Sequence, residues 1–322
     1  MNTIEYNKLY TDAKTKQKRE TCKICGKKCT SFCKSHTLPQ MVLENLANDG
    51  MVNSFFFDGN PSTSPNVMKP EYGVKNAGVF YEICRDCDSK VFQEYENNEN
   101  LSKEPSDKML NLIALKSSLF YYYKYRIEQI ADHKLLNSVK GHEIIDQNNI
   151  TYEQELDADI KECIKNITCF SHDNFKVLFW KKLNYIVPIA FQGLIEPLLD
   201  FNGDRIFGKK TTTFIVIAPL ENCSIVCLFC KNKKDEYSKL NFPLNASPSK
   251  KLSLINNMVL SCSEDFFINK NLFKNITVKE TEILKTICYK LEFHNLPSFE
   301  MKRDLFKNCF KYPNLLNEKY KI

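Results

Sequence analysis

The sequence predicts an α+β protein with two domains, a small zinc-binding domain over residues 1–100 and a larger domain over residues 101–322. Two Cys-x-x-Cys pairs inside the first hundred residues predict the first domain. In the second, segments with helical periodicity alternate with runs of β-branched and aromatic residues, which predicts helices packed on one antiparallel sheet. A polar stretch at residues 96–105 marks the expected boundary between them.

The two cysteine pairs supply four thiolates, the usual ligand set of a closed structural zinc site. The pairs are Cys22 with Cys25 and Cys84 with Cys87. Cys29 and Cys33 leave an alternative open, because they extend the first pair into a local string of four cysteines that could bind a metal alone. Two identical units, each beside a turn or a helix start, close more easily into a tetrahedron, so we favour the distant pairing and a structural zinc ion.

The cysteine content and the first residues of the chain indicate a cytoplasmic protein. Residues 1–19 are polar and lysine-rich and lack the apolar run of a signal peptide. Fourteen cysteines without an export signal fit a reducing compartment, with thiols bound to metal or buried. Cys223, Cys227 and Cys230 lie in a run with the composition of a buried strand, so we expect them in a core. No stretch reaches about 18 uninterrupted apolar residues, so no membrane span is expected.

Positive charge is concentrated at the start of the chain. Residues 1–34 hold nine Lys or Arg against three acidic residues, within a net charge of +6. A basic arm that leads into a zinc knuckle fits a phosphate backbone, and DNA is the partner that we expect. The alternative is a solvated segment whose charges balance the four thiolates.

The first domain contains several short elements. Residues 1–21 are expected to form an exposed lead-in that could include one short helix, 38–47 an amphipathic helix, 51–75 a loop, 78–83 a strand and 88–96 a helix. The apolar face of the last helix would consist of Val91, Phe92 and Tyr95.

The second domain begins with a long helix. Ser106 is a good N-cap for a helix that reaches about residue 133. Further helices are expected at 152–168, 247–258 and 277–291, and strands at 175–183, 185–191 and 211–230. This larger domain could bind a protein partner or a second copy of the chain.

One stretch of the long helix, Tyr121-Tyr122-Tyr123-Lys124-Tyr125-Arg126, mixes aromatic and cationic side chains. Such a strip could stack bases and bind phosphates. The alternative, which we favour, is a packed helix with amphipathic side chains at its rim.

Within residues 20–97 the sequence resembles the HNH nuclease family in its zinc-stapled form. The residues that carry the resemblance are Cys22, Cys25, Ser35-His36-Thr37-Leu38-Pro39, Cys84, Cys87 and the acidic residues Glu94 and Glu96. The resemblance implies a treble-clef-like ββα-metal domain that cleaves DNA phosphodiester bonds. Such modules commonly serve bacterial antiviral defence or mobile elements.

The resemblance also implies roles for individual residues. His36 would be the general base, and Glu96, with Glu94 as a neighbour, would bind a catalytic Mg²⁺ or Mn²⁺ ion. Asp88 would orient His36 or bind the metal. The chain departs from the family at Ser35, where many relatives carry an acidic residue or a histidine. The alternative is therefore a non-catalytic module with a degenerate site, which binds nucleic acid or a protein partner.

Overall fold

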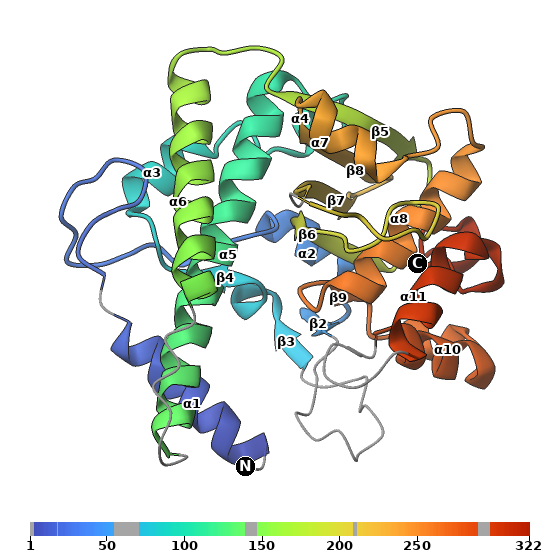
Figure 1. Cartoon of the computed structure of the whole chain (residues 1–322), viewed down its shortest axis with the longest axis horizontal. Helices are drawn as coiled ribbons and strands as arrows, with labels where there is room; N and C mark the ends of the chain where they lie inside the picture. The colour runs from blue at the N-terminus through green and yellow to red at the C-terminus, as the bar shows by residue number, and fades with distance from the viewer. Residues whose placement is uncertain (1–2, 18, 55–70, 139–146, 209–210, 289–296) are drawn as a thin grey trace.

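The computed structural model describes residues 3–17, 19–54, 71–138, 147–208, 211–288 and 297–322 (Figure 1). Its helices are α1 (Thr3–Lys16), α2 (Gln40–Leu46), α3 (Arg85–Val91), α4 (Asn98–Leu101), α5 (Asp107–Ser138), α6 (Gln147–Thr168), α7 (Lys234–Tyr237), α8 (Pro248–Cys262), α9 (Leu272–Asn275), α10 (Val278–Cys288) and α11 (Pro297–Lys307). Its strands are β1 (Ser35–His36), β2 (Met51–Ser54), β3 (Glu71–Gly73), β4 (Val79–Phe80), β5 (Phe175–Leu183), β6 (Ile189–Ile195), β7 (Thr213–Pro219), β8 (Ser224–Lys231) and β9 (Phe267–Ile268). The mixed α+β class is confirmed.

The strands form two sheets in the described part of the chain. Seven strands make one antiparallel sheet in the order β3-β2-β9-β6-β7-β8-β5. The other sheet is the pair β1–β4, in which Ser35 lies opposite Phe80 and His36 opposite Val79. Because β2 and β3 precede residue 100, the large sheet contains strands from both sides of the expected domain boundary.

Helices cover both faces of the central strands. Helices α5 and α6 pack side by side on one face, and α8, α10 and α11 lie on the other (Figure 1). The residues of strand β8 are almost continuously apolar because they enter two separate hydrophobic cores, one on each face of the sheet. Ile225, Cys227 and Phe229 belong to the first core, and Val226 and Leu228 belong to the second. A strand that is buried on both faces needs no polar alternation.

The cysteines of this sheet are core residues, as predicted. Cys223, Cys227 and Cys230 are all buried, and Cys227 and Cys230 belong to opposite cores. Side chains on opposite faces of a strand cannot share a metal ion.

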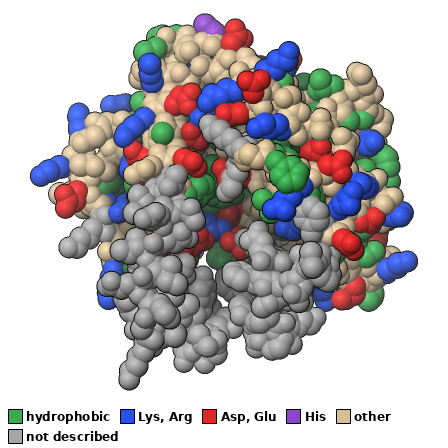
Figure 2. All heavy atoms as spheres, viewed as in Figure 1, with side chains coloured by type: hydrophobic (Ala, Val, Ile, Leu, Met, Phe, Trp, Pro, Cys, Tyr) green, Lys and Arg blue, Asp and Glu red, His purple; other side chains and the backbone are tan. Residues whose placement is uncertain are grey.

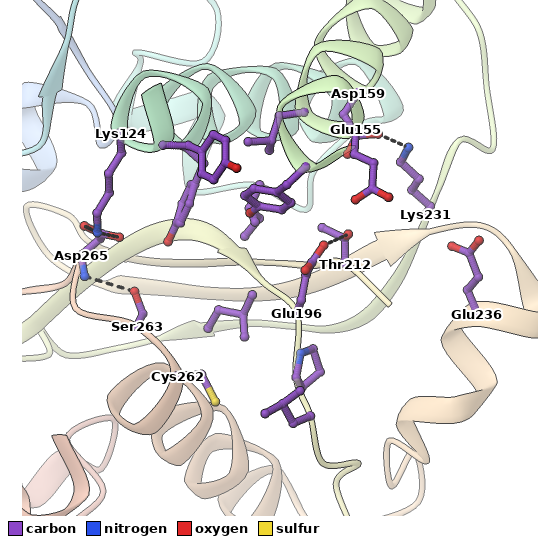
Figure 3. A pocket seen from close by; sticks show the side chains of 18 of the residues that line it. Lys124, Glu155, Asp159, Glu196, Thr212, Lys231, Glu236, Cys262, Ser263 and Asp265 are labelled. Atoms are coloured by element: carbon purple, nitrogen blue, oxygen red, sulfur yellow. Dashed lines mark hydrogen bonds and ion pairs between the residues drawn. The ribbon is translucent and has the colours of Figure 1, made fainter. Parts of the chain in front are cut away.

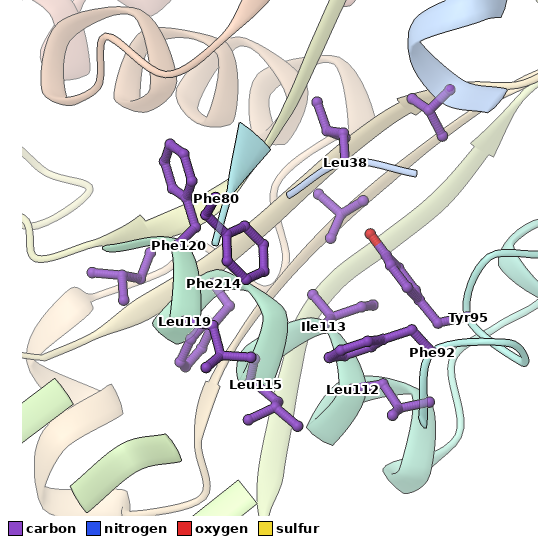
Figure 4. Packing of buried hydrophobic residues seen from close by; sticks show 14 of the residues in the cluster. Leu38, Phe80, Phe92, Tyr95, Leu112, Ile113, Leu115, Leu119, Phe120 and Phe214 are labelled. Carbon is purple, nitrogen blue, oxygen red and sulfur yellow. The ribbon is translucent and has the colours of Figure 1, made fainter. Parts of the chain in front are cut away.

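The N-terminal region packs on α5 rather than standing apart. Phe80, Phe92 and Tyr95 are fully buried, and they pack with Leu112 and Ile113 of α5 in one cluster (Figure 4). Helix α1 lies along the same helix (Figure 1). The expected lead-in therefore contains a longer helix than predicted, in which Ala13 is buried against the core while Thr11, Thr15 and Lys16 are exposed as expected.

Several local predictions were accurate and others were not. Ser106 accepts a hydrogen bond from the backbone N–H of Met109 at 3.2 Å, which confirms the N-cap of α5. The helix expected over 88–96 ends instead at Val91, and a bend and a turn follow over residues 92–95. The loop expected over 51–75 contains β2 and β3, while 55–70 lie outside the described residues. The strand expected at 185–191 is shifted to β6.

Across the described segments, every helix is too short or too polar to cross a membrane.

Candidate metal centre and histidine cluster

The four predicted cysteine ligands lie together. The Sγ atoms of Cys22, Cys25, Cys84 and Cys87 are all within 4.8 Å of one another, and those of Cys25 and Cys84 are 4.0 Å apart. A tetrahedral zinc site with Zn–S bonds of about 2.3 Å places its sulfurs roughly 3.8 Å apart. The arrangement therefore fits a structural zinc ion, and the distant pairing of the two Cys-x-x-Cys units is confirmed.

Backbone hydrogen bonds bring the two halves of this centre together. The first pair lies in a tight turn closed by Cys22 N–H to Lys27 O at 2.9 Å, where Gly26 adopts a φ of +68°. Cys84 is the N-cap residue of α3, and its N–H donates to the Sγ of Cys22 at 3.3 Å. A peptide N–H that points at a sulfur stabilises the thiolate form.

The thiols cannot all ionise without a counter-charge. Burial, together with the Cys84 and Cys25 thiols, raises the pKa of Cys87. At Cys84 burial acts in the same direction, but hydrogen bonds from the Cys87 backbone and the neighbouring thiols outweigh it and lower its pKa to about 7. A zinc ion at this centre would supply the charge that lets all four sulfurs bind as thiolates.

The other two N-terminal cysteines lie outside this ligand set. The Sγ of Cys29 donates to Lys27 O at 3.3 Å, and that of Cys33 donates to Asp88 Oδ2 at 3.2 Å. Burial and the Asp88 carboxylate raise the pKa of Cys33 to about 11. The alternative of a local four-cysteine site is not adopted.

His36 lies on β1, directly after Ser35, which is hydrogen-bonded to Asp88 of α3. The Nε2 of His36 is 3.2 Å from the carbonyl oxygen of Val74, and a carbonyl only accepts hydrogen bonds. Nε2 therefore carries the proton, which leaves a lone pair on Nδ1. Burial, with added effects of the Lys116 and Lys34 charges, lowers the pKa of His36, so that the ring is neutral at pH 7.

Asp88 is engaged with the residues that precede His36. Ser35 Oγ donates to Asp88 Oδ1 at 2.5 Å, and the Cys33 thiol donates to the other oxygen. Asp88 was expected to orient His36 by accepting a hydrogen bond from its ring, but its two oxygens accept from Ser35 and Cys33 instead, and the ring proton on Nε2 is donated to the Val74 carbonyl.

Lys116 of α5 lies between two of the predicted acidic site residues, Asp88 and Glu96. Its side chain is 0% exposed, and its ammonium group pairs with the Glu96 carboxylate and lies 3.9 Å from Asp88 Oδ1. The same ammonium lies 4.4 Å from the centre of the Phe92 ring. Asp88 and Glu96, which the sequence predicted as site residues, thus meet one buried cation, whose charge also acts on the predicted base His36.

Glu94 lies outside this cluster. Its carboxylate pairs with Lys108, and both side chains are nearly half exposed. The residue between the two glutamates, Tyr95, is buried and donates its hydroxyl to Gln192 of β6. Because the chain turns after Val91, Glu94 and Glu96 face different surroundings.

Part of the basic N-terminal segment serves internal contacts. Arg19 pairs with Glu82 at 3.3 Å and lies over the Tyr123 ring, and Lys23 pairs with Asp157 at 2.7 Å. Lys27, Lys28, Lys34 and Arg85 are exposed. Over the described part of the face in Figure 2, basic and acidic side chains are interspersed.

The tyrosine strip of α5 is packed rather than available for base stacking. Tyr122 and Tyr123 are each 5% exposed, and Tyr121 is close enough to β6 that a Cβ on Gly193 would lie 2.9 Å from its hydroxyl. The interpretation of this stretch as a packed helix is supported.

A cavity of about 1210 Å³ lies between α5, α6 and the ends of the central strands (Figure 3). Its described carboxylates are Glu128, Glu155, Asp159, Glu162, Glu196, Glu236, Glu264 and Asp265, and its described lysines are Lys124, Lys231, Lys233 and Lys302. Lys124 pairs with Glu264 and Asp265, and Lys231 pairs with Asp159 and Glu162. An acidic lining of this kind disfavours a phosphate backbone, and the predicted site residues do not line it.

Sequence reasoning missed Lys116. A signal was present, because Lys116 is four residues after Leu112 and three before Leu119, on the apolar face of α5. A lone lysine on a buried stripe requires a partner, and the partner proved to be Glu96.

Comparison of the chain with protein-family models, with curated proteins and with solved structures finds no match.

Proposed function

We propose that this chain is a zinc-stapled endonuclease similar to the HNH family, which cleaves DNA phosphodiester bonds with His36 as the general base. The observation that carries the proposal is the position of His36 on β1, directly after Ser35, whose hydroxyl group donates to Asp88, the residue that follows the candidate zinc ligand Cys87. The tautomer of His36 is defined by the Val74 carbonyl, and its ring is in electrostatic contact with Glu96 and Lys116.

The local fold supports the proposal. The pair β1–β4 is followed by α3, and cysteines precede β1 and open α3. Two short strands and a helix beside a four-cysteine cluster support the treble-clef-like ββα arrangement that the resemblance implies. Zinc in a closed four-sulfur site does no chemistry; it would hold the segment that precedes β1 and the start of α3 together.

The chemistry of this proposal begins with the lone pair on His36 Nδ1. A water molecule attacks phosphorus while Nδ1 takes its proton, the bond from phosphorus to the leaving sugar oxygen breaks, and that oxygen takes a proton from solvent. A histidine with a lowered pKa is ready for this role at neutral pH, because it needs no prior deprotonation.

Exposed cations near the histidine could bind the DNA backbone. Lys34 directly precedes β1 and its charge acts on His36, and Arg85 opens α3 and acts on Cys33. Lys27 and Lys28 add two more exposed cations, in and next to the turn that carries Cys22 and Cys25. Phosphate contacts of this kind give affinity that falls steeply with salt.

The residues present do not fit a catalytic Mg²⁺ or Mn²⁺ ion in this arrangement. Asp88 and Glu96 are the available carboxylates, but the Lys116 ammonium lies against both of them. Glu94, the other predicted ligand, pairs with Lys108.

The same observation favours a second candidate function, a zinc-containing module that binds nucleic acid without cleaving it. A degenerate site would contain a buried lysine of this kind, whose ammonium group lies close to both acidic side chains. This candidate predicts salt-sensitive retention on DNA with no cleavage under any divalent ion.

Cleavage of supercoiled plasmid tests the proposal. The wild-type protein should nick or linearise the plasmid in at least one of three buffers: with Mg²⁺, with Mn²⁺, or freed of divalent ions. His36→Ala should lower the rate by about 10²- to 10⁴-fold, the usual contribution of a general base, with unchanged zinc content.

His172→Ala is the matched control. This histidine is exposed and lies 3.3 Å from Asp107, so its loss should leave cleavage unchanged. Equal rates for the wild type and His36→Ala would refute the proposal.

A further inference from the structure

Among the lysines and arginines whose burial the structure describes, Lys116 is the one that is fully buried. It lies in the first third of α5 and is fully buried, with apolar residues before and after it on the same face. Burial of a charged amine is unfavourable unless the charge is paired. The surroundings of its ammonium group therefore indicate what holds it there.

Those surroundings are anionic and aromatic. The ammonium pairs with Glu96, lies 3.9 Å from Asp88 Oδ1, and lies 4.4 Å and 5.6 Å from the ring centres of Phe92 and Tyr95. Ring faces attract cations, and carboxylates attract them more strongly. The group occupies the point at which the two acidic side chains converge.

We propose that the Lys116 ammonium is the resident cation of this site, in place of a divalent metal ion. The protein then binds zinc at its four cysteines and no second divalent ion at Asp88 and Glu96. Where the proposed function holds, DNA cleavage proceeds in buffer freed of Mg²⁺ and Mn²⁺.

Charge balance supports the inference. Two carboxylates with one ammonium carry a net charge of −1, and an approaching divalent ion meets the repulsion of the ammonium at short range. Without the ammonium, two carboxylates carry −2 and offer the oxygen ligands that Mg²⁺ and Mn²⁺ prefer. Removal of the Lys116 charge should therefore create a divalent site.

Binding of Mn²⁺ to the zinc-loaded full chain tests the inference independently of catalysis. Electron paramagnetic resonance of free Mn²⁺ should show no saturable binding to the wild type at millimolar concentration. Lys116→Met keeps most of the aliphatic volume and should bind Mn²⁺ at least about tenfold more tightly than the wild type.

Lys108→Met is the matched control. Lys108 also lies on α5 and also pairs with a glutamate, Glu94, but this pair is nearly half exposed. Lys116 instead meets two carboxylates, those of Glu96 and Asp88. This variant should bind Mn²⁺ no better than the wild type.

The outcomes separate the two proposals. Stoichiometric Mn²⁺ binding to the wild type that Asp88→Asn abolishes would overturn the inference, and this measurement does not depend on whether Lys116→Met folds. Absence of Mn²⁺ binding together with absence of cleavage would refute the proposed function and leave the cation assignment supported.

Discussion

The ion pair between Lys116 and Glu96 makes a prediction about stability that depends on which partner is removed. Lys116 is fully buried, whereas the Glu96 side chain is 36% exposed. Glu96→Gln leaves a buried ammonium with only Asp88 at 3.9 Å, and unpaired buried charges cost about 3–5 kcal/mol. Because Glu96 is partly solvated, we expect a loss of about 2–4 kcal/mol in the free energy of unfolding.

Lys116→Met should cost less. The carboxylates that remain can be hydrated at the rim, and the methionine preserves the contacts of the aliphatic stem, so we expect a loss of about 1–2 kcal/mol. The double variant should lose less than the sum of the single variants, with a coupling energy of about 1–3 kcal/mol.

Urea unfolding of the zinc-loaded proteins, followed by circular dichroism, measures these differences. Lys108→Met with Glu94→Gln provides the exposed reference pair, for which we expect a coupling energy below about 1 kcal/mol. Additive losses at Lys116 and Glu96 would refute the reasoning, because they would mean that the two charges do not depend on each other.

Two further predictions concern the histidine and the zinc. The pKa of His36 is lowered in the folded protein, so as the pH falls below the ordinary value near 6.5 the unfolded chain takes up a proton before the folded protein does. The free energy of unfolding should therefore fall as the pH drops below that value. Replacement His36→Gln should make the free energy of unfolding, measured between pH 5 and 7, less dependent on pH. Removal of zinc with a strong chelator should expose the segment around Cys22 and the start of α3 to hydrogen exchange while β7 and β8 stay protected, because only the first two are joined through the metal. Uniform loss of protection over the whole chain would contradict this second expectation.

The metal centre could be predicted because its information is local. Each Cys-x-x-Cys unit places two ligands on one turn or helix start, and four thiolates need one ion, so only the pairing of the units remained to be chosen. The long helix α5 could be predicted for the same reason, since Ser106 caps it and its periodicity extends over many turns.

The histidine cluster could be predicted only in part, because its geometry depends on tertiary contacts. The chain leaves the helical path after Val91, so Glu94 and Glu96 separate although they are two residues apart. The tautomer of His36 is set by the Val74 carbonyl, a partner 38 residues away that has no side-chain signature. Lys116 reaches the site from beyond the expected domain boundary.

The sheet shows the same limit. Strands β2 and β3 are four and three residues long, and β9 is two residues long, so their pairing depends on the neighbours that they meet rather than on propensity. The helix α11 was not predicted, although Leu305 and Phe306 belong to the second core.

X-ray absorption spectroscopy at the zinc edge tests the central claim most directly. We predict one zinc ion per chain with four sulfur ligands at about 2.3 Å, lost when Cys84 and Cys87 are both replaced by serine. A nitrogen ligand in place of one sulfur, or a four-sulfur site that survives this double replacement, would contradict the account, because His36 would then be a zinc ligand or the second cysteine pair would be dispensable.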